Sequence, residues 1–207
     1  MAELNRTYLF APGNHARKVE KVFDSGCDVV ILDLEDAVAV AEKASTRAVI
    51  VQALKKPRQC RGYVRVNAID TSFCFDDIEA TVGPWLDGVC LPKVESAADL
   101  LRADWLISNL ERRVGLPEAS IDLLPIIETA KGMGAIREIT IGTKRLKRVC
   151  FGAGDYTRDL GLIWTFEEKE LAAARAELVL ASRIAEIEPP IDTVFIHIRE
   201  NTVFSES

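Results

Sequence analysis

No stretch of lysine and arginine stands out in this sequence of 207 residues, and its formal net charge is −6 at pH 7. A protein that follows the backbone of a nucleic acid needs clustered positive charge, so we expect no nucleic-acid partner. Long apolar runs are also missing, since none approaches the roughly 18 residues of a membrane-spanning helix. The first ten residues, MAELNRTYLF, lack the basic region and apolar stretch of a secretory signal. We therefore expect no membrane segment.

Cysteine and histidine are few, and their spacing argues against several kinds of site. The five cysteines form no C-x-x-C pair and are odd in number, which predicts a reducing, cytoplasmic compartment. The two histidines, His15 and His197, do not give the local spacing of a zinc site. No G-x-S-x-G motif occurs, which argues against a Ser–His–Asp hydrolase.

Short apolar runs alternate with longer amphipathic segments along the whole chain. The seven runs are residues 7–11, 28–34, 62–67, 88–92, 122–127, 148–152 and 191–198. They are rich in Val, Ile, Leu and Phe, as buried parallel strands are, and the alternation predicts a parallel sheet covered by helices. Seven strands favour a TIM-type β/α-barrel, but an ordinary barrel of this type needs about 250 residues and an eighth strand. We therefore predict an α/β fold, a single barrel domain over residues 1–207 that lacks the last strand–helix unit.

Helix starts can be predicted at three places. Thr165 and Glu168 have the spacing of a capping box, in which the threonine accepts from first-turn amides and the glutamate reaches back. This predicts a helix over 166–187. Asn14 and Ser96 are the expected N-caps of two further helices.

Polar side chains follow the expected strands at the points where the strands end. The carboxyl ends of parallel strands meet at one edge, where the reactive groups of such folds gather. These side chains are Asp33, Glu35, Asp36, Arg65, Asn67, Lys93, Glu128, Thr129 and Asp155. We expect them to lie together at the carboxyl-terminal opening of the barrel.

The alternation of side chains along a strand refines this expectation. Tyr63, Arg65 and Asn67 share one face of their strand, and the opposite face must be apolar to pack against helices. Arg65 should therefore point into the barrel near its top. Ile126 and Glu128 share a face in the same way. An isolated buried carboxylate is costly to desolvate, so Glu128 is expected to have a cation or an arginine as its partner.

Two carboxylates on adjacent strands, Glu128 and Asp155, suit Mg²⁺, which prefers oxygen ligands and usually takes one or two protein carboxylates. A 2-keto or 2-hydroxy acid could complete the metal's coordination shell. Gly152 and Gly154 let backbone N–H groups approach an anion closely, so the loop 152–155 is expected to cradle a carboxylate. Lys93 has two possible roles. It could be a Schiff-base nucleophile, or it could be a lysine that forms an ion pair with a nearby acid.

Six motifs, taken in chain order, resemble the citrate lyase beta-subunit-like family of the HpcH/HpaI aldolase group. They are RTYLFAPG (6–13), LDLEDAV (32–38), RVN (65–67), LPKVES (91–96), PIIET (125–129) and FGAGDY (151–156). Together they run through nearly the whole chain, from about residue 6 to residue 195. The motifs are highly specific in combination, and LDLEDAV would be a strong signal by itself.

The resemblance implies a TIM-type barrel that uses Mg²⁺ to cleave or form acyl-CoA thioesters of hydroxy acids, of the citryl-, malyl- or citramalyl-CoA class. The small-molecule product would be a 2-keto acid such as oxaloacetate, pyruvate or glyoxylate. By motif position, Glu128 and Asp155 match the metal ligands and Arg65 matches an arginine on the reacting oxygens. Glu35 and Asp36 match acidic groups that hold metal-bound waters. Members of the family are commonly homo-oligomers, with a trimer favoured.

The resemblance stops near residue 195. Family members usually continue with a further helix, an eighth strand containing an I-H-P-x-Q-like segment and a C-terminal lid, and residues 197–207 do not resemble these parts. The chain is therefore expected to be a natural short form or an incomplete one, and its general base is unassigned. Two alternatives stay open: a metal-dependent aldolase acting on a free keto acid, and a non-catalytic barrel subunit that binds metal and keto acid.

Overall fold

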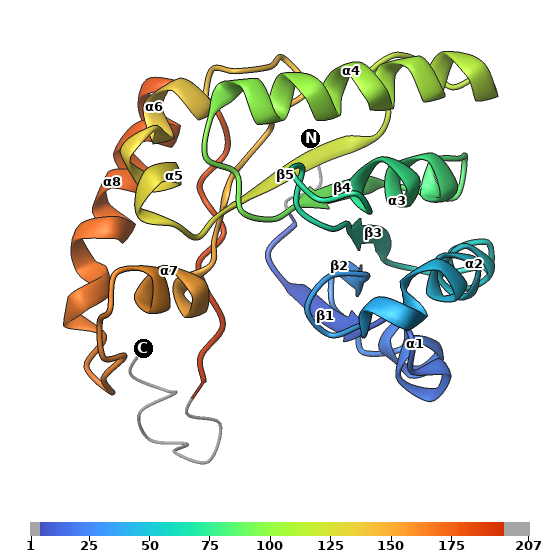
Figure 1. Ribbon diagram of the computed structural model, residues 1–207, viewed down its shortest axis with the longest axis horizontal. Helices are drawn as coiled ribbons and strands as arrows, with labels where there is room; N and C mark the ends of the chain where they lie inside the picture. The colour runs from blue at the N-terminus through green and yellow to red at the C-terminus, as the bar shows by residue number, and fades with distance from the viewer. Residues whose placement is uncertain (1–4, 197–207) are drawn as a thin grey trace. The chain divides into compact units, whose positions relative to one another are not determined.

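A computed structural model of the chain describes residues 5–196. Six strands form one sheet in sequential order, and the pairings β1–β2, β2–β3, β3–β4 and β5–β6 are parallel. The strands are β1 (Tyr8–Pro12), β2 (Val29–Asp33), β3 (Arg61–Arg65), β4 (Gly88–Leu91), β5 (Asp122–Ile127) and β6 (Cys150–Phe151). Helices follow the strands along the chain (Figure 1). The predicted α/β fold with a parallel sheet is confirmed.

The seventh expected strand, 191–198, does not form over residues 191–196. Ile191 makes an isolated parallel bridge with Cys150, in which Phe151 N donates to Ile191 O over 2.9 Å. After Ile191, the next two side chains bind groups elsewhere in the chain. Asp192 forms an ion pair with Arg175, and the Thr193 hydroxyl accepts from the backbone N–H of Ala153. The rest of that run, residues 197 and 198, lies outside the described residues, as does His197.

The described residues fall into two compact units. Unit 1 comprises residues 5–92 and 101–124, and unit 2 comprises residues 93–100 and 125–196. Along the chain, the boundary between the units falls within α4 (Ala97–Val114) and within β5. The single domain expected for residues 1–207 stays a prediction.

Unit 1 holds strands β1 to β4 and the helices that connect them. These are α1 (Ala16–Val22), α2 (Lys43–Leu54), which follows the short 3-10 turn η1 (Val40–Glu42), and α3 (Cys74–Thr81). They lie beside the strands that they join (Figure 1). All five residues of β2 are buried, as expected for a parallel strand covered on both faces. The strand register pairs Asp33 with Arg65, so the last residues of β2 and β3 are neighbours.

Unit 2 holds the end of β5, strand β6 and four helices. The helices are α5 (Ala130–Gly134), α6 (Ile136–Ile139), α7 (Ala153–Asp159) and α8 (Ala172–Ile184), and the last follows the 3-10 turn η2 (Lys169–Leu171). Helix α6 packs against α8 (Figure 1), with Ile139 and Leu178 buried. The rings of Phe151 and Tyr156 meet edge to face at 5.3 Å, which packs α7 onto the end of β6.

The capping box predicted at Thr165 is wrong. Glu168 has a left-handed backbone with φ of 49°, and the regular helix begins later, at Ala172. The Glu168 carboxylate accepts from the Trp164 indole N–H and from Arg175 instead of reaching back. Thr165 donates its hydroxyl to Glu170 over 2.9 Å.

The other two expected N-caps have different outcomes. The Ser96 hydroxyl accepts from the backbone N–H of Asp99 over 3.3 Å at the start of α4, which confirms that cap. The N-cap of α1 is His15, whose side chain makes no capping bond. The prediction for Asn14 is therefore wrong, because its amide donates to Glu42 over 2.7 Å and is turned away from the helix.

All five cysteines are free thiols, and three of them, Cys74, Cys90 and Cys150, are buried. Burial, helped by the neighbouring acids Asp77 and Asp70, raises the pKa of the Cys74 thiol to about 12. This thiol is therefore an inert core group. Over residues 5–196, no helix combines the length and the apolar character needed to cross a membrane.

Candidate active site

The carboxyl ends of β2 and β3 bring together a half-buried arginine and two buried acids in unit 1. Arg65 Nε lies 2.7 Å from Asp33 Oδ1, and its Nη2 lies 2.7 Å from Asp33 Oδ2. Its Nη1 lies 3.1 Å from Glu35 Oε2. The guanidinium also lies over the Phe10 ring, 5.2 Å from its centre. Asp33 therefore holds Arg65 through two parallel hydrogen bonds, the geometry that fixes a guanidinium most strictly.

Charge and hydrogen bonding keep this pair ionised. Burial by itself would raise the pKa of the Asp33 carboxyl, but the hydrogen bonds and charge of Arg65 outweigh it and hold that pKa below its ordinary value. The backbone N–H groups of Glu35 and Ala37 act in the same direction. Burial would lower the pKa of Arg65, but Asp33 and Glu35 raise it above its ordinary value. Arg65 thus stays a cation within the protein.

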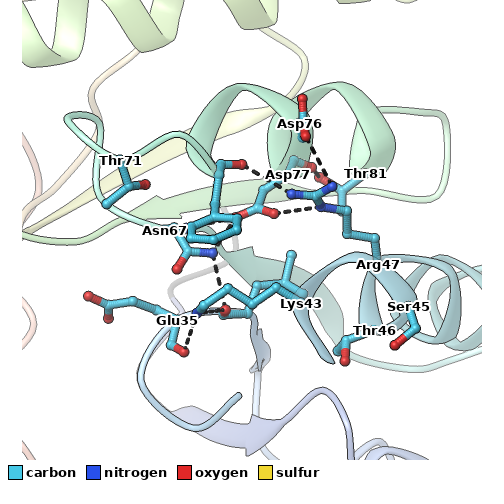
Figure 2. Close-up of polar contacts among 12 residues, drawn as sticks. Glu35, Lys43, Ser45, Thr46, Arg47, Asn67, Thr71, Asp76, Asp77 and Thr81 are labelled. Atoms are coloured by element: carbon cyan, nitrogen blue, oxygen red, sulfur yellow. Dashed lines mark hydrogen bonds and ion pairs between the residues drawn. The ribbon is translucent and has the colours of Figure 1, made fainter. Parts of the chain in front are cut away.

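Further hydrogen bonds hold the backbone of the acidic loop, residues 34–37 (Figure 2). The buried Lys43 ammonium, at the start of α2, donates to Leu34 O over 2.8 Å and to Glu35 O over 2.7 Å. The Asn67 amide donates to Leu34 O over 3.1 Å. Three hydrogen bonds from these two side chains therefore end on two adjacent carbonyl groups, which fixes the backbone from which the Glu35 side chain extends.

One of these donors, Asn67, is itself held by a fully buried carboxylate on α3, that of Asp77. Asp77 Oδ2 accepts from both the backbone N–H and the side-chain amide of Asn67, and Asp77 Oδ1 accepts from Arg47 Nε over 2.7 Å. Figure 2 shows Arg47 reaching from α2 towards Asp77 and Asp76 on α3. Helices α2 and α3 are thereby joined to the loop by charged and amide groups whose partners are all within the protein.

In unit 2, the carboxylate of Glu128 is buried directly after β5. Its Oε1 accepts from the backbone N–H of Lys93 over 2.8 Å. Lys93 has a left-handed backbone with φ of 51°, a conformation that costs a non-glycine residue about 1 kcal/mol or more and that turns its N–H towards the acid. A Cβ atom added to Gly152 would lie 2.5 Å from Glu128 Oε2 and 2.7 Å from Glu128 Cβ. Only glycine at position 152 leaves room for Glu128.

Asp155 lies in the first turn of α7, three residues after Gly152. The Lys93 ammonium approaches Asp155 Oδ2 at 3.7 Å, and both side chains are about one third exposed. Lys93 therefore contacts both acids, Glu128 through its backbone and Asp155 through its side chain. Gly154, by contrast, is exposed, and a Cβ there would meet only Trp164 at 3.8 Å, which is ordinary contact.

The unit 2 acids fit a hard divalent cation by their chemistry. Glu128 and Asp155 supply carboxylate oxygens, the ligands that such a cation prefers, and Gly152 leaves room for the Glu128 carboxylate. Within the described part of the chain, no group of three or more His, Cys, Asp or Glu side chains could hold a metal. A two-carboxylate set of this kind suits Mg²⁺, which keeps several waters, rather than a structural zinc site.

The structure thus brings the predicted site residues together in two sets. Arg65 and Glu35 are in direct contact in unit 1. In unit 2, Glu128 and Asp155 both contact Lys93, and Gly152 lies against Glu128. Asp36 is exposed and Gly154 makes no close approach. The expectation that Arg65 faces a barrel lumen stays a prediction, as do the roles given to all of these residues.

Sequence reasoning missed two residues of unit 1. Asp33 was placed at a strand end but given no role, although its in-register pairing with Arg65 follows from aligning the two apolar strands. Lys43 resembled a surface residue at the start of an amphipathic helix. No local signal marks a lysine that is buried by a loop eight residues away.

Curated relatives of known name match most of the chain. The family model described as HpcH/HpaI aldolase/citrate lyase matches residues 6–207. The chain is 36% identical, over 93% of its length, to citrate lyase subunit beta of Haemophilus influenzae, and it covers 67% of that protein. It is 37% identical, over 78% of its length, to L-malyl-CoA/beta-methylmalyl-CoA lyase of Cereibacter sphaeroides, and it covers 52% of that enzyme.

A solved structure of a citrate lyase beta subunit also matches the chain. The citrate lyase beta subunit of Mycobacterium tuberculosis, complexed with oxaloacetate and magnesium, superimposes with a TM-score of 0.78 and 28% sequence identity. The match covers 98% of this chain and 84% of that one. These matches confirm the resemblance of the six sequence motifs, and the chain belongs to the HpcH/HpaI aldolase/citrate lyase family.

Proposed function

We propose that the protein is an Mg²⁺-dependent carbon–carbon lyase on a variant of the TIM-type barrel. Its substrate would be a hydroxy-acyl-CoA thioester of the citryl-, malyl- or citramalyl-CoA class, cleaved to a 2-keto acid and an acyl-CoA. Support comes from the lyase names of the curated relatives and from the oxaloacetate and magnesium of the M. tuberculosis structure. Because the chain spans 67% and 52% of the two relatives, its activity has to be tested on this chain itself.

The observation that carries the proposal is the arrangement around Gly152. The buried Glu128 carboxylate fills the space where any larger residue would have its Cβ, and Asp155 follows on the first turn of α7. The Lys93 ammonium lies 3.7 Å from Asp155, so a cation already sits beside this acid. We infer that Glu128 and Asp155 are the protein ligands of the metal.

Each residue then has a defined task. When bound, Mg²⁺ would polarise the substrate's hydroxyl and neighbouring carboxylate oxygens and lower the pKa of that hydroxyl. Arg65 would donate hydrogen bonds to the oxygen on which negative charge develops. As a base takes the hydroxyl proton, the carbon–carbon bond breaks, its electron pair passes to the thioester half as an enolate, and the other half becomes the 2-keto acid. A proton is then returned to the enolate carbon, which gives the acyl-CoA.

The acids at the end of β2 have supporting tasks in this proposal. Glu35, held against Arg65, and the exposed Asp36 would accept hydrogen bonds from metal-bound waters. The backbone N–H groups that follow Gly152 would approach the substrate carboxylate, with Gly154 and Asp155 on the same turn.

The direct test is an assay of the purified protein with Mg²⁺ and each of citryl-, malyl- and citramalyl-CoA. Keto-acid release that EDTA abolishes and added Mg²⁺ restores is the expected result. Cleavage of a free hydroxy or keto acid, with no cleavage of the thioesters, would favour the metal-dependent aldolase. Borohydride trapping at Lys93 would favour an amine mechanism. A folded protein that binds Mg²⁺ and oxaloacetate but cleaves no substrate would favour a non-catalytic subunit.

Arg65 can be tested separately in the same assay. Arg65→Ala should lower kcat by at least about a hundredfold, because removing one stabiliser of a developing oxyanion costs on the order of 3 kcal/mol. Mg²⁺ binding should be unchanged, since the proposed metal ligands are Glu128 and Asp155. A variant with near-normal turnover would remove Arg65 from the mechanism.

A further inference from the structure

We propose that Asp33 is a positioning residue, which acts through Arg65 by holding its guanidinium in one orientation for the reaction. The proposal rests on the function proposed above and adds a residue to which no role had been given. Asp33 is buried, and its side chain is 3% exposed. It makes its contacts with the protein itself, so its effect on the substrate would be transmitted by Arg65.

The geometry leaves the carboxylate of Asp33 no freedom to turn. Each of its oxygens accepts two hydrogen bonds, one from Arg65 and one from the backbone of the acidic loop. Oδ1 accepts from the Glu35 N–H over 2.9 Å, and Oδ2 accepts from the Ala37 N–H over 3.1 Å. The backbone of the loop therefore fixes the orientation of the Asp33 carboxylate, and Asp33 fixes the orientation of the Arg65 guanidinium.

The same geometry leaves part of the guanidinium for the substrate. An arginine side chain has five N–H bonds in a fixed plane. Asp33 takes one from Nε and one from Nη2, while Nη1 lies 3.1 Å from Glu35 Oε2 as an ion pair. The hydrogen bonds to Asp33 leave one N–H on Nη2 and both N–H bonds of Nη1, and all three are held in a known plane. Without Asp33 the side chain could rotate, and those donors would lose their direction.

A structural role alone would be a competing explanation, and unit 1 contains a matched control for it. Asp87 pairs with Arg58 over 2.6 Å and also accepts from the backbone N–H of Gly62 over 2.8 Å. Residue 87 precedes β4, whereas residue 33 ends β2, so the two pairs lie at opposite ends of the parallel strands. Both are aspartate–arginine pairs braced by the backbone, but only one contains Arg65.

The test is a double-mutant cycle with Asp33→Asn and Arg65→Ala, with Asp87→Asn as the control. Asp33→Asn in the wild-type background should lower kcat by on the order of 10- to 100-fold, the usual effect of removing a group that orients a functional side chain, with KM changed less than about threefold. In the Arg65→Ala background it should lower kcat less than about threefold, because the two residues act as one unit. Asp87→Asn should leave kcat near that of the wild type.

Equal losses of kcat in both backgrounds would overturn the proposal, and so would a loss no larger than that of Asp87→Asn. Should Asp33→Asn not fold, Asp33→Glu keeps the charge and displaces the carboxylate by one methylene group. This variant should show the same dependence on Arg65.

A second measurement does not depend on the reaction. Phenylglyoxal modification of Arg65, followed by mass spectrometry, should be faster in folded Asp33→Asn than in the wild type by about fivefold or more, since the paired guanidinium is shielded. Unchanged reactivity would overturn the positioning role. An inactive wild-type protein with the expected change in reactivity would count against the proposed lyase function and leave the role of Asp33 standing.

Discussion

Gly152 is a residue whose type is dictated by its close neighbours, chiefly Glu128. Its φ is −102°, which any residue can adopt, so its backbone does not require glycine. The requirement comes from Glu128, whose carboxylate and Cβ lie 2.5 and 2.7 Å from where a Cβ of residue 152 would be. The absence of a side chain at Gly152 accommodates one of the protein's own carboxylates, whereas the role of loop 152–155 as a carboxylate cradle stays a prediction.

Gly152→Ala should therefore displace Glu128. We expect Mg²⁺ affinity and kcat to fall by about tenfold or more, with a loss of about 1–3 kcal/mol in the free energy of unfolding from overpacking. Isothermal titration and urea denaturation would measure these effects. Gly154→Ala is the matched control, because its nearest contact is at an ordinary 3.8 Å. Equal behaviour of the two variants would contradict this account of Gly152.

At the level of single residues, the sequence predicted which side chains gather but not how they pair. Glu128, Asp155 and Arg65 follow from strand ends and alternation, which are local rules. That Asp33 would bind Arg65 requires the strand register, and that Lys93 would contact both acids requires its unusual backbone. Aligning the two apolar strands gives the register, but no feature of the sequence alone marks the backbone conformation of Lys93.

Helix α2 is the element that links the site of unit 1 to its scaffold. Its first residue, Lys43, donates to two carbonyl groups of the acidic loop, and Arg47, one turn later, binds Asp77 on α3. An amphipathic pattern predicts the helix, but its charged residues would be assigned to solvent by the same pattern. The structure places these two cations inward, where they order a loop.

Lys43→Met should cost about 1–3 kcal/mol of unfolding free energy, because two buried carbonyl groups lose their charged donor. It should also lower kcat, since the loop that carries Glu35 is released. Lys56→Met is the control: this lysine is 66% exposed and its contact with Glu20 is 3.7 Å long. A surface pair of that kind contributes little, so urea denaturation should show a change of less than about 0.5 kcal/mol. Similar losses in both variants would argue against the role of Lys43.

The strands and helices were predicted more reliably than their ends. Six of seven apolar runs became strands, since runs of Val, Ile and Leu bounded by polar residues have few other structures in a chain of alternating elements. The seventh fails at Asp192 and Thr193, whose side chains bind Arg175 and Ala153. The capping box fails for a similar reason, because Glu168 is held by Trp164 and Arg175, which no local rule anticipates.

For the whole molecule, the free energy of unfolding at acidic pH should depend on Asp33. Its folded-state pKa lies below the ordinary value of about 3.9, so its contribution is fully present above that pH and is lost as the pH falls through the lower folded value. The difference in unfolding free energy between the wild type and Asp33→Asn should be constant from pH 7 to about 5 and should shrink below about 4. Urea denaturation across that range would measure it. A difference that stays constant down to pH 3 would show that Asp33 carries no such linkage.

The family is established for the chain as a whole, whereas the closed barrel, the homotrimer and the cytoplasmic location stay predictions. The two sets of site residues belong to different compact units, and the function proposed above requires both. The metal is the part of that proposal that can be measured without knowing the acyl group, because it depends on two acids within unit 2.

The most direct test is therefore Mn²⁺ binding, followed by the electron paramagnetic resonance signal of the free ion. One site per chain is expected in the wild type, with loss of that site in Glu128→Gln and in Asp155→Asn and competition by Mg²⁺. Asp159→Asn, on the same helix as Asp155 and bonded to the Ala130 N–H, should keep it, because asparagine can still accept that bond. Binding that survives both Glu128→Gln and Asp155→Asn would contradict the proposed metal centre.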